Sequence, residues 1–422
     1  MNGFAVEEEY RETVEGELKD LKVSVKDGIC VKGMQSAASS AILKGYKPLF
    51  NATAVQRLLN KGATVIGKTV QDEFGFGSFC LNVGDGFTAP TNPHDEERVC
   101  GGSSGGCAAV TAQLGDDHVS LGESTGGSIV CPAAYCGVVG LCPTYGRVSR
   151  YGLIDYANSM DKIGPIAKSV KQCAQILGHI AGYDENDPTS LQVPVDDYTS
   201  FLGKGVSGLK IGVIKESKDV DESVLNEFEK TIEGLKEKGA QVDEVSLPLT
   251  TKYGIEAYYV LALSEASTNL SKYCGIRYGA SEALEGNFNE YFAKVRGKYF
   301  GKEVKRRILL GTFARMSGYR DAYYMKALKV RTKIIEEYKG LFKEYDVLIS
   351  PTMPNLPPKI AEVEELTPLE QYMMDVLTVG PNIAGMPHIS VPMGEGIPKG
   401  FLIIGDHMQE GKIIQVANEL HN

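Results

Sequence analysis

The fold class of this chain is decided by residues 209–247, LKIGVIKESKDVDESVLNEFEKTIEGLKEKGAQVDEVSL. Residues 209–216 and 240–247 are short runs rich in apolar side chains, which is typical of buried strands. Between them, residues 223–238 carry apolar side chains at the spacing of one helix face: Val224, Leu225, Phe228, Ile232 and Leu235. A strand, a helix and a second strand form a βαβ unit, and such units build mostly parallel sheets. We therefore expect an α/β protein.

The same patterns recur on both sides of this unit. They predict helices at 51–61, 105–114, 321–342 and 412–420, and strands at 63–67, 346–350, 388–393 and 400–404. Residues 75–152 are rich in glycine and turn residues, and a long irregular stretch inside a compact domain is usually functional. No repeat or linker divides the chain. We expect residues 1–422 to form one domain with a helical excursion at about 250–340.

Composition excludes several classes of protein. The formal net charge of −10 opposes a sequence-wide grip on a polyanion. No run of about 18 apolar residues predicts a membrane span, and the acidic residues 1–20 do not resemble a signal peptide. Nine scattered cysteines favour reduced thiols and a cytoplasmic location. Cys131, Cys136 and Cys142 include no CxxC pair, so their spacing does not favour a zinc site.

Two short motifs suggest other functions. Residues 62–69, GATVIGKT, match the phosphate-loop pattern, but a helix precedes them and ATVI suits a strand, so nucleotide binding is not favoured. Residues 102–106 and 122–126 match the GxSxG elbow of serine hydrolases, which needs a histidine base further along the chain. His388 and His407 come late enough, but His388 lies in an apolar strand where a packed imidazole is expected. An elbow hydrolase built on Ser124 stays open as an alternative.

A third constellation meets a definite chemical need. Residues 101–106 read GGSSGG, residues 125–128 read TGGS, and Lys26 lies well upstream. A serine hydroxyl becomes a good nucleophile only when a base takes its proton. A buried lysine is such a base if desolvation lowers its pKa, and a second serine can bridge the two groups. The backbone amides around the attacked carbonyl could form an oxyanion hole: Thr125, Gly126, Gly127 and Ser128.

The stretch from 21 to 165 resembles the amidase-signature family. It contains VSVKDGI, GATVIGKTVQDEFGFGS, CGGSSGGCAA, STGGSI and DKIGP. The resemblance implies the amidase-signature fold, with a large, mixed, mostly parallel central sheet covered by helices on both faces. It also implies that Ser128 is the nucleophile, that Ser103 relays the proton after a cis peptide at Gly102, and that Lys26 is the final base. It implies no metal and no cofactor in this chain.

Blocks further along the chain are similar to the A subunits of tRNA-dependent amidotransferases: SEASTNLSKYCGIRYG, EVKRRILLGTFARMSGYRDAYY and NIAGMPHISVP. This resemblance implies a glutaminase that supplies ammonia for amidating Glu-tRNA(Gln), Asp-tRNA(Asn) or both. Its partners would be subunits B and C, with the mischarged tRNA, ATP and Mg²⁺ bound by the partner. The α-groups of glutamine would be held by Tyr258 or Tyr259, Arg307 and Asp375. From the residues alone, Arg307 could instead lie on a solvated helix face.

The chain departs from the family pattern at several points. Ser124 and Val130 stand where the family has an aspartate and an arginine. Because both charges are absent together, no unpaired charge remains, and we expect the local geometry to hold. Cys107 replaces the usual serine, and the chain begins later than typical members, so one or two peripheral helices are expected to be missing. A stand-alone amidase for a small amide and a catalytically weak scaffold subunit stay open as alternatives.

Overall fold

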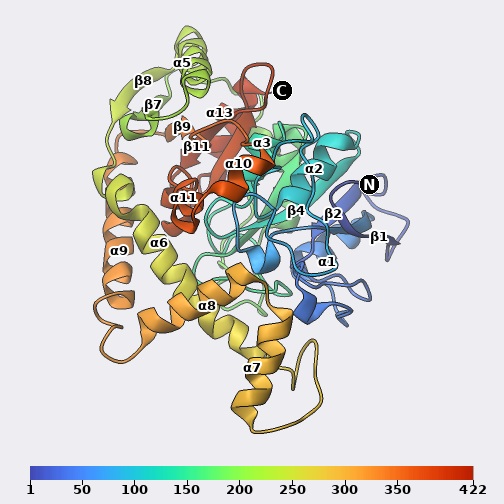
Figure 1. The fold of residues 1–422 in the computed structure, drawn as a ribbon. Helices are drawn as coiled ribbons and strands as arrows, with labels where there is room; N and C mark the ends of the chain where they lie inside the picture. The colour runs from blue at the N-terminus through green and yellow to red at the C-terminus, as the bar shows by residue number, and fades with distance from the viewer. Residues whose placement is uncertain (422) are drawn as a thin grey trace.

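One mixed sheet runs through the computed structural model, which describes residues 1–421 (Figure 1). Within that range the strand order is β1-β3-β2-β4-β6-β5-β10-β11-β9-β7-β8. The strands are β1 Phe4–Tyr10, β2 Lys22–Lys26, β3 Thr64–Thr69, β4 His118–Ser124, β5 Val139–Cys142, β6 Lys162–Ala167, β7 Lys210–Ile214, β8 Gln241–Val245, β9 Val347–Pro351, β10 His388–Pro392 and β11 Gly400–Gly405.

Helices cover both faces of this sheet, as expected. Along β11, Leu402 and Ile404 belong to one apolar core and Phe401 and Ile403 to the other, because successive strand residues point to opposite faces. The helices are α1 Thr53–Leu59, α2 Gly105–Gln113, α3 Val130–Tyr135, α4 Val170–Ile180, α5 Glu222–Glu237, α6 Pro248–Asn269, α7 Phe288–Tyr299, α8 Lys302–Arg315, α9 Tyr324–Leu341, α10 Ile360–Glu365, α11 Pro368–Met373, α12 Val379–Ile383 and α13 Glu410–Leu420.

The βαβ unit predicted from residues 209–247 is confirmed. Strands β7 and β8 are parallel neighbours joined by α5, whose apolar face is buried. The other predicted elements are present with ends that differ by a few residues. Residues 248–341 form the helices α6 to α9, and α7 projects from the body of the molecule in Figure 1.

The prediction that the sheet is mostly parallel was wrong. Parallel pairing is confined to two groups of strands, β3-β2-β4 and β9-β7-β8. The run from β4 through β6, β5, β10 and β11 to β9 is antiparallel, and so is the edge pair β1-β3. The consecutive strands β10 and β11 need only a short loop to pair antiparallel, whereas each parallel pair needs a crossover.

The first parallel group brings distant polar residues together. Strand β2 pairs with β4 in the register Val25 to Leu121, so Lys26 and Glu123 emerge near the same edge of the sheet. The carboxyl ends of parallel strands are where open α/β sheets build their sites. Among residues 1–421, no helix has the length and apolarity that crossing a bilayer requires.

Candidate active site

Lys26 is the last residue of β2, and its side chain is fully buried. Its Nζ lies 2.7 Å from Ser103 Oγ, 2.8 Å from Glu123 Oε2 and 2.9 Å from the carbonyl oxygen of Glu123. A buried amine costs free energy unless its donors are matched, and here three acceptors surround it. The lysine and the first serine that the sequence singled out are therefore in direct contact.

Ser103 and Ser104 precede α2 and tie the two glycine-rich segments together. The peptide between Gly102 and Ser103 is cis. The Ser104 amide donates to the Ser128 carbonyl oxygen at 3.2 Å, and the Ser104 hydroxyl donates to the Glu123 carbonyl oxygen at 3.0 Å. Gly102 has no room for a side chain, because a Cβ there would lie 2.1 Å from Asp72 Oδ2. These contacts place the GGSSGG and TGGS segments side by side.

Ser128 lines a small cavity and is 8% exposed. The cavity holds about 10 Å³, the space of a single water molecule. Most of the residues that the sequence assigned to catalysis or glutamine binding share this wall with the serine: Gly126, Gly127, Tyr258, Tyr259, Arg307 and Asp375. Glutamine is larger than this space, so its binding requires the lining side chains to move.

The two tyrosines reach the cavity from α6, and Asp375 reaches it from the segment that follows α11. The Tyr259 hydroxyl donates to Asp375 Oδ2 at 2.7 Å, and its ring stacks on Tyr372 with centroids 4.1 Å apart. The ring of Tyr258 lies against Gly126, where a Cβ would come within 2.4 Å of the hydroxyl. Burial raises the pKa of Asp375 to about 6, so this carboxyl is mainly ionised at neutral pH.

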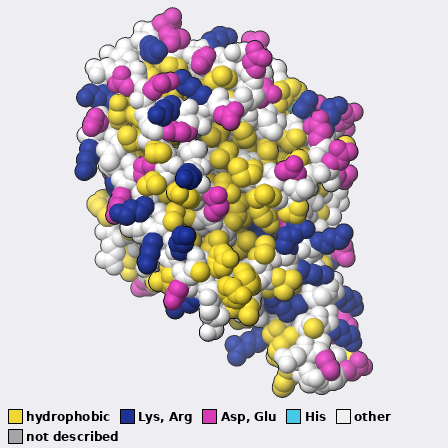
Figure 2. Space-filling model, turned by 60° about the vertical axis from the view of Figure 1, so that its left-hand side comes forward, with side chains coloured by type: hydrophobic (Ala, Val, Ile, Leu, Met, Phe, Trp, Pro, Cys, Tyr) yellow, Lys and Arg dark blue, Asp and Glu magenta, His cyan; other side chains and the backbone are white. Residues whose placement is uncertain are grey.

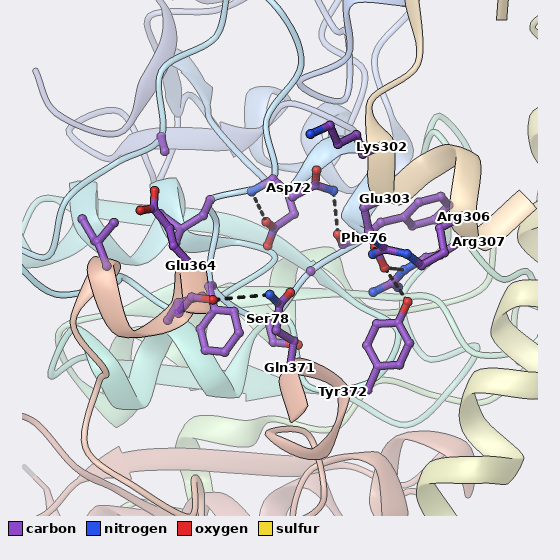
Figure 3. A pocket seen from close by; sticks show the side chains of 17 residues that line it. Asp72, Phe76, Ser78, Lys302, Glu303, Arg306, Arg307, Glu364, Gln371 and Tyr372 are labelled. Atoms are coloured by element: carbon purple, nitrogen blue, oxygen red, sulfur yellow. Dashed lines mark hydrogen bonds and ion pairs between the residues drawn. The ribbon is translucent and has the colours of Figure 1, made fainter. Parts of the chain in front are cut away.

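Arg307 is buried rather than solvated. It lies on α8 with 3% exposure, whereas the side chain of its neighbour Arg306 is 42% exposed. Its Nε donates to Glu303 Oε1 at 2.7 Å and its Nη1 donates to the Tyr156 hydroxyl at 2.8 Å. The Tyr372 hydroxyl also donates to Glu303, at 2.6 Å. In Figure 3, Glu303, Arg307 and Tyr372 point toward one another at one side of a pocket.

That pocket is the larger cleft of the region, about 500 Å³, and Ser128 does not line it. Gly77, Ser78 and Arg307 belong to both the cleft and the small cavity. Because covalent chemistry needs a nucleophile, the small cavity is the better candidate for the reaction. Through these shared residues the cleft adjoins the small cavity, with Arg307 at the boundary.

Sequence reasoning missed an acidic group beside Lys26. Glu123, near the end of β4, forms a buried ion pair with Lys26. The Thr125 hydroxyl lies 2.8 Å from Glu123 Oε1 and 2.7 Å from Asp161 Oδ1. The side chain of Thr125 thus faces these two carboxyls, and Thr125 is not among the residues that line the cavity. Glutamate in GESTGG was visible in the sequence, but only the β2-β4 register shows that it meets the lysine.

Ser124 and Val130, where the chain departs from the family, are both fully buried. The Ser124 hydroxyl donates to Asn382 Oδ1 and accepts from the Gly127 amide, each at 3.2 Å. This contact occupies one of the four amides expected in the oxyanion hole. Between Ser124 and His388 lies Asn382, whose Nδ2 is 3.2 Å from His388 Nε2. Burial lowers the pKa of His388, and no direct serine–histidine contact supports the elbow hydrolase in residues 1–421.

Lys68 of the phosphate-loop pattern lies in β3 rather than in a loop. Its Nζ donates to Ser36 Oγ at 2.9 Å, to the Asp27 carbonyl oxygen at 3.3 Å and to the Ile29 carbonyl oxygen. The strand and these internal partners leave no phosphate cradle. In the part of the chain that the structure describes, no group of three or more His, Cys, Asp or Glu side chains could hold a metal ion.

Comparison with known proteins identifies the family. A family model described as Amidase matches residues 4–414. The chain is 46% identical over 422 residues to the A subunit of glutamyl-tRNA(Gln) amidotransferase from Halobacterium salinarum, covering 99% of this chain and 98% of that protein.

Solved structures agree. That of the A subunit of glutamyl-tRNA(Gln) amidotransferase from Thermotoga maritima superposes with a TM-score of 0.83 at 38% identity, covering 100% of this chain and 89% of that one. Peptide amidase from Stenotrophomonas maltophilia superposes with a TM-score of 0.76 at 30% identity, covering 96% and 82%. The sequence resemblance is therefore confirmed over nearly the whole length, and the chain belongs to the amidase family.

Proposed function

We propose that this chain is the glutamine-hydrolysing subunit of a tRNA-dependent amidotransferase. One observation carries the proposal. Ser128 shares a small cavity with Arg307 and Asp375, which suit the two charged α-groups of an amino acid. Ser103, in contact with Lys26, directly precedes Ser104, whose amide donates to the Ser128 carbonyl oxygen. The family and the relatives named above point to the same activity.

The proposed reaction begins with Ser128 Oγ attacking the side-chain carboxamide carbon of glutamine. Ser103 takes the Ser128 proton while its own proton passes to Lys26 Nζ, 2.7 Å away. The amides of Gly126 and Ser128 are the expected donors to the tetrahedral oxyanion, each contributing about 3 kcal/mol. Returning the proton to the leaving nitrogen expels ammonia and leaves a γ-glutamyl ester on Ser128. Water then attacks this ester, passing a proton through Ser103 to Lys26, and the proton returns to Ser128 Oγ as glutamate leaves.

Recognition of glutamine is assigned to the other wall of the cavity. The Arg307 guanidinium would pair with the α-carboxylate, and the Asp375 carboxylate with the α-ammonium. Tyr259 holds Asp375 in place through its hydroxyl. Glu303 pairs with the Arg307 guanidinium, so the α-carboxylate of glutamine must displace or join it.

We propose that the chain acts within a multi-subunit complex with subunits B and C. There, ammonia would pass to a partner that binds the mischarged tRNA and uses ATP with Mg²⁺.

Figure 2 shows hydrophobic side chains gathered on the face that carries α6 and α9. An apolar patch of this kind often marks a protein interface. Exposed side chains at the α8–α9 junction contribute to the apolar surface: Leu309, Leu310, Phe313, Met316, Tyr319 and Tyr323. The cytoplasmic location stays a prediction.

Trapping the acyl-enzyme tests this function. Glutamine mixed with the full chain and its partner subunits, then quenched in acid, is expected to leave a γ-glutamyl ester on the peptide that contains Ser128. Mass spectrometry of the digested protein locates the ester, and Ser128→Ala is the blank. An ester on Ser124 would instead establish the elbow hydrolase, and turnover of simple amides but not glutamine would establish a stand-alone amidase.

The glycine before the nucleophile gives a further prediction. Gly127 has φ +151°, and a Cβ there would lie 2.3 Å from Thr378 Oγ1. Gly127→Ala is therefore expected to shift Ser128 and the oxyanion amides, lowering kcat for glutamine by about 100-fold. Gly178→Ala is the matched control, because that helical position has open space around it. Equal activity of both variants would contradict the assignment of this loop.

A further inference from the structure

The proposed proton path leaves one buried group unused, the carboxylate of Glu123. It lies 2.8 Å from Lys26 Nζ with side-chain exposures of 6% and 1%. A buried charge pair of this kind is costly to form, and removing one partner is destabilising, so such a pair is retained only where its other contacts compensate. Glu123 has these contacts, because its carbonyl oxygen accepts from both Lys26 and Ser104.

Glu123 fixes the direction of the Lys26 amine. Its carbonyl oxygen and its Oε2 take two of the N–H donors, which leaves the remaining position on nitrogen facing Ser103 Oγ. In the ammonium form that position is a third N–H. In the neutral amine it is the lone pair that must accept the Ser103 proton. The same two acceptors on Glu123 therefore serve both protonation states.

The hydrogen bonds behind Glu123 link it through Thr125 to a second buried carboxyl, Asp161. Thr125 has a single hydroxyl proton but lies within 2.8 Å of a carboxyl oxygen on each side, Glu123 Oε1 and Asp161 Oδ1. Both short contacts are hydrogen bonds only if one carboxyl is protonated and donates to the threonine oxygen. Burial, followed by the nearby Glu123 charge, raises the pKa of Asp161 well above its ordinary value. Asp161 also accepts the backbone amides of Tyr156 and Ala157, and Glu123 is the carboxylate that pairs with Lys26.

We propose that Glu123 is a positioning residue that aims Lys26 at Ser103 and whose negative charge shapes the pH dependence of the reaction. The inference rests on the proposed glutaminase function. An opposite charge in hydrogen-bond contact favours the charged form of a basic group. Removing the negative charge of Glu123 should therefore change the pH dependence of hydrolysis.

In the described part of the chain, the other titratable groups near Lys26 do not form a hydrogen bond with its amine. Asp72, which follows β3, has its pKa raised by burial to about 7 and accepts the amides of Cys80 and Asn82. The thiols of Cys80 and Cys107 also feel the lysine charge, but burial raises their pKa. Glu123 is the carboxylate in direct contact with the amine.

The test compares the pH dependence of kcat in wild type, Glu123→Gln and Glu123→Asp. Saturating glutamine is used because kcat then does not report the protonation of Asp375 in the free protein. Glu123→Gln keeps an oxygen acceptor but removes the charge. The pH at which kcat falls off on the acid side, the acid limb of the profile, is therefore expected to decrease by at least about one unit, which is a tenfold gain in rate at pH values below both midpoints. Aspartate keeps the charge, and its limb is expected to stay near that of wild type.

Glu123→Leu removes both the charge of the side chain and its hydrogen bond to the Lys26 amine, so comparison with Glu123→Gln separates the two effects. It is expected to show the lowered acid limb together with a plateau kcat reduced by about 30-fold, because nothing then directs the amine. An unmoved limb in Glu123→Gln would overturn the proposal. A collapsed plateau in Glu123→Gln would also overturn it, since the glutamate would then be transferring the proton itself. In each case, the rate of glutamine hydrolysis is corrected by subtracting the rate measured with Ser128→Ala. If Ser128→Ala hydrolyses glutamine as fast as wild type, the glutaminase assignment fails rather than the role of Glu123.

Discussion

Ser128→Ala is expected to lower the rate of ammonia release from glutamine by about 10⁴-fold or more. Without the hydroxyl, no acyl-enzyme forms, and the remaining groups can only polarise the carboxamide. The measurement is a coupled ammonia assay with the partner subunits present. Residual activity from binding and the oxyanion amides is expected to persist above the uncatalysed rate.

Ser124→Ala is the matched control for this loss. Its hydroxyl is fully buried and bonded to Asn382 and the Gly127 amide, so its removal loosens the loop without deleting a nucleophile. We expect a loss of kcat below about tenfold, in line with one or two neutral hydrogen bonds. The reverse order of effects, with Ser124→Ala inactive and Ser128→Ala active, would contradict the site as assigned.

Arg307→Ala is expected to lower kcat/KM for glutamine by about 100- to 1000-fold. The guanidinium is buried and would bind the α-carboxylate through charge-assisted hydrogen bonds worth about 3 kcal/mol or more. Most of the loss should fall on KM, because the carboxylate is bound equally in the ground and transition states. Steady-state kinetics with glutamine measure both constants.

Two controls make this result specific. Arg306→Ala removes the neighbouring, exposed guanidinium of the same helix and is expected to change kcat/KM by less than about threefold. A simple aliphatic amide without α-groups should be hydrolysed equally by wild type and Arg307→Ala, however slowly. If hydrolysis of that amide falls as much as hydrolysis of glutamine, Arg307 acts by supporting Tyr156 and Glu303 rather than by binding substrate.

Local patterns predicted the elements better than their pairing. The apolar runs at 209–216 and 240–247 became β7 and β8 because each run is short and bounded by turns. Strands β4 and β6 were not predicted, since HVSLGES and KIGPIA carry glycine, proline or charge that lowers strand propensity. Both are fully buried in the centre of the sheet, where tertiary packing outweighs that preference.

In the candidate site, too, the residue types could be predicted from the sequence but their contacts could not. Spacing and chemistry singled out Lys26, Ser103 and Ser128 because their residue types form a recognisable set. The burial of Arg307 could not be read from Lys305-Arg306-Arg307, because helix phase decides which of the three points inward. Glu123 escaped notice for another reason. Its meeting with Lys26 depends on the register between β2 and β4, which involves residues nearly a hundred positions apart.

The order of the site along the chain has a consequence for how such proteins diversify. The proposed bond-breaking set, Lys26, Ser103 and Ser128, lies in the first third of the sequence. The residues proposed to bind glutamine, Tyr259, Arg307 and Asp375, come from helices and loops that follow it along the chain. Changes in the later segments can therefore alter which amide is admitted while leaving the hydrolytic apparatus untouched. One scaffold can in this way serve free amino acids, peptides or other amides by exchanging a single wall.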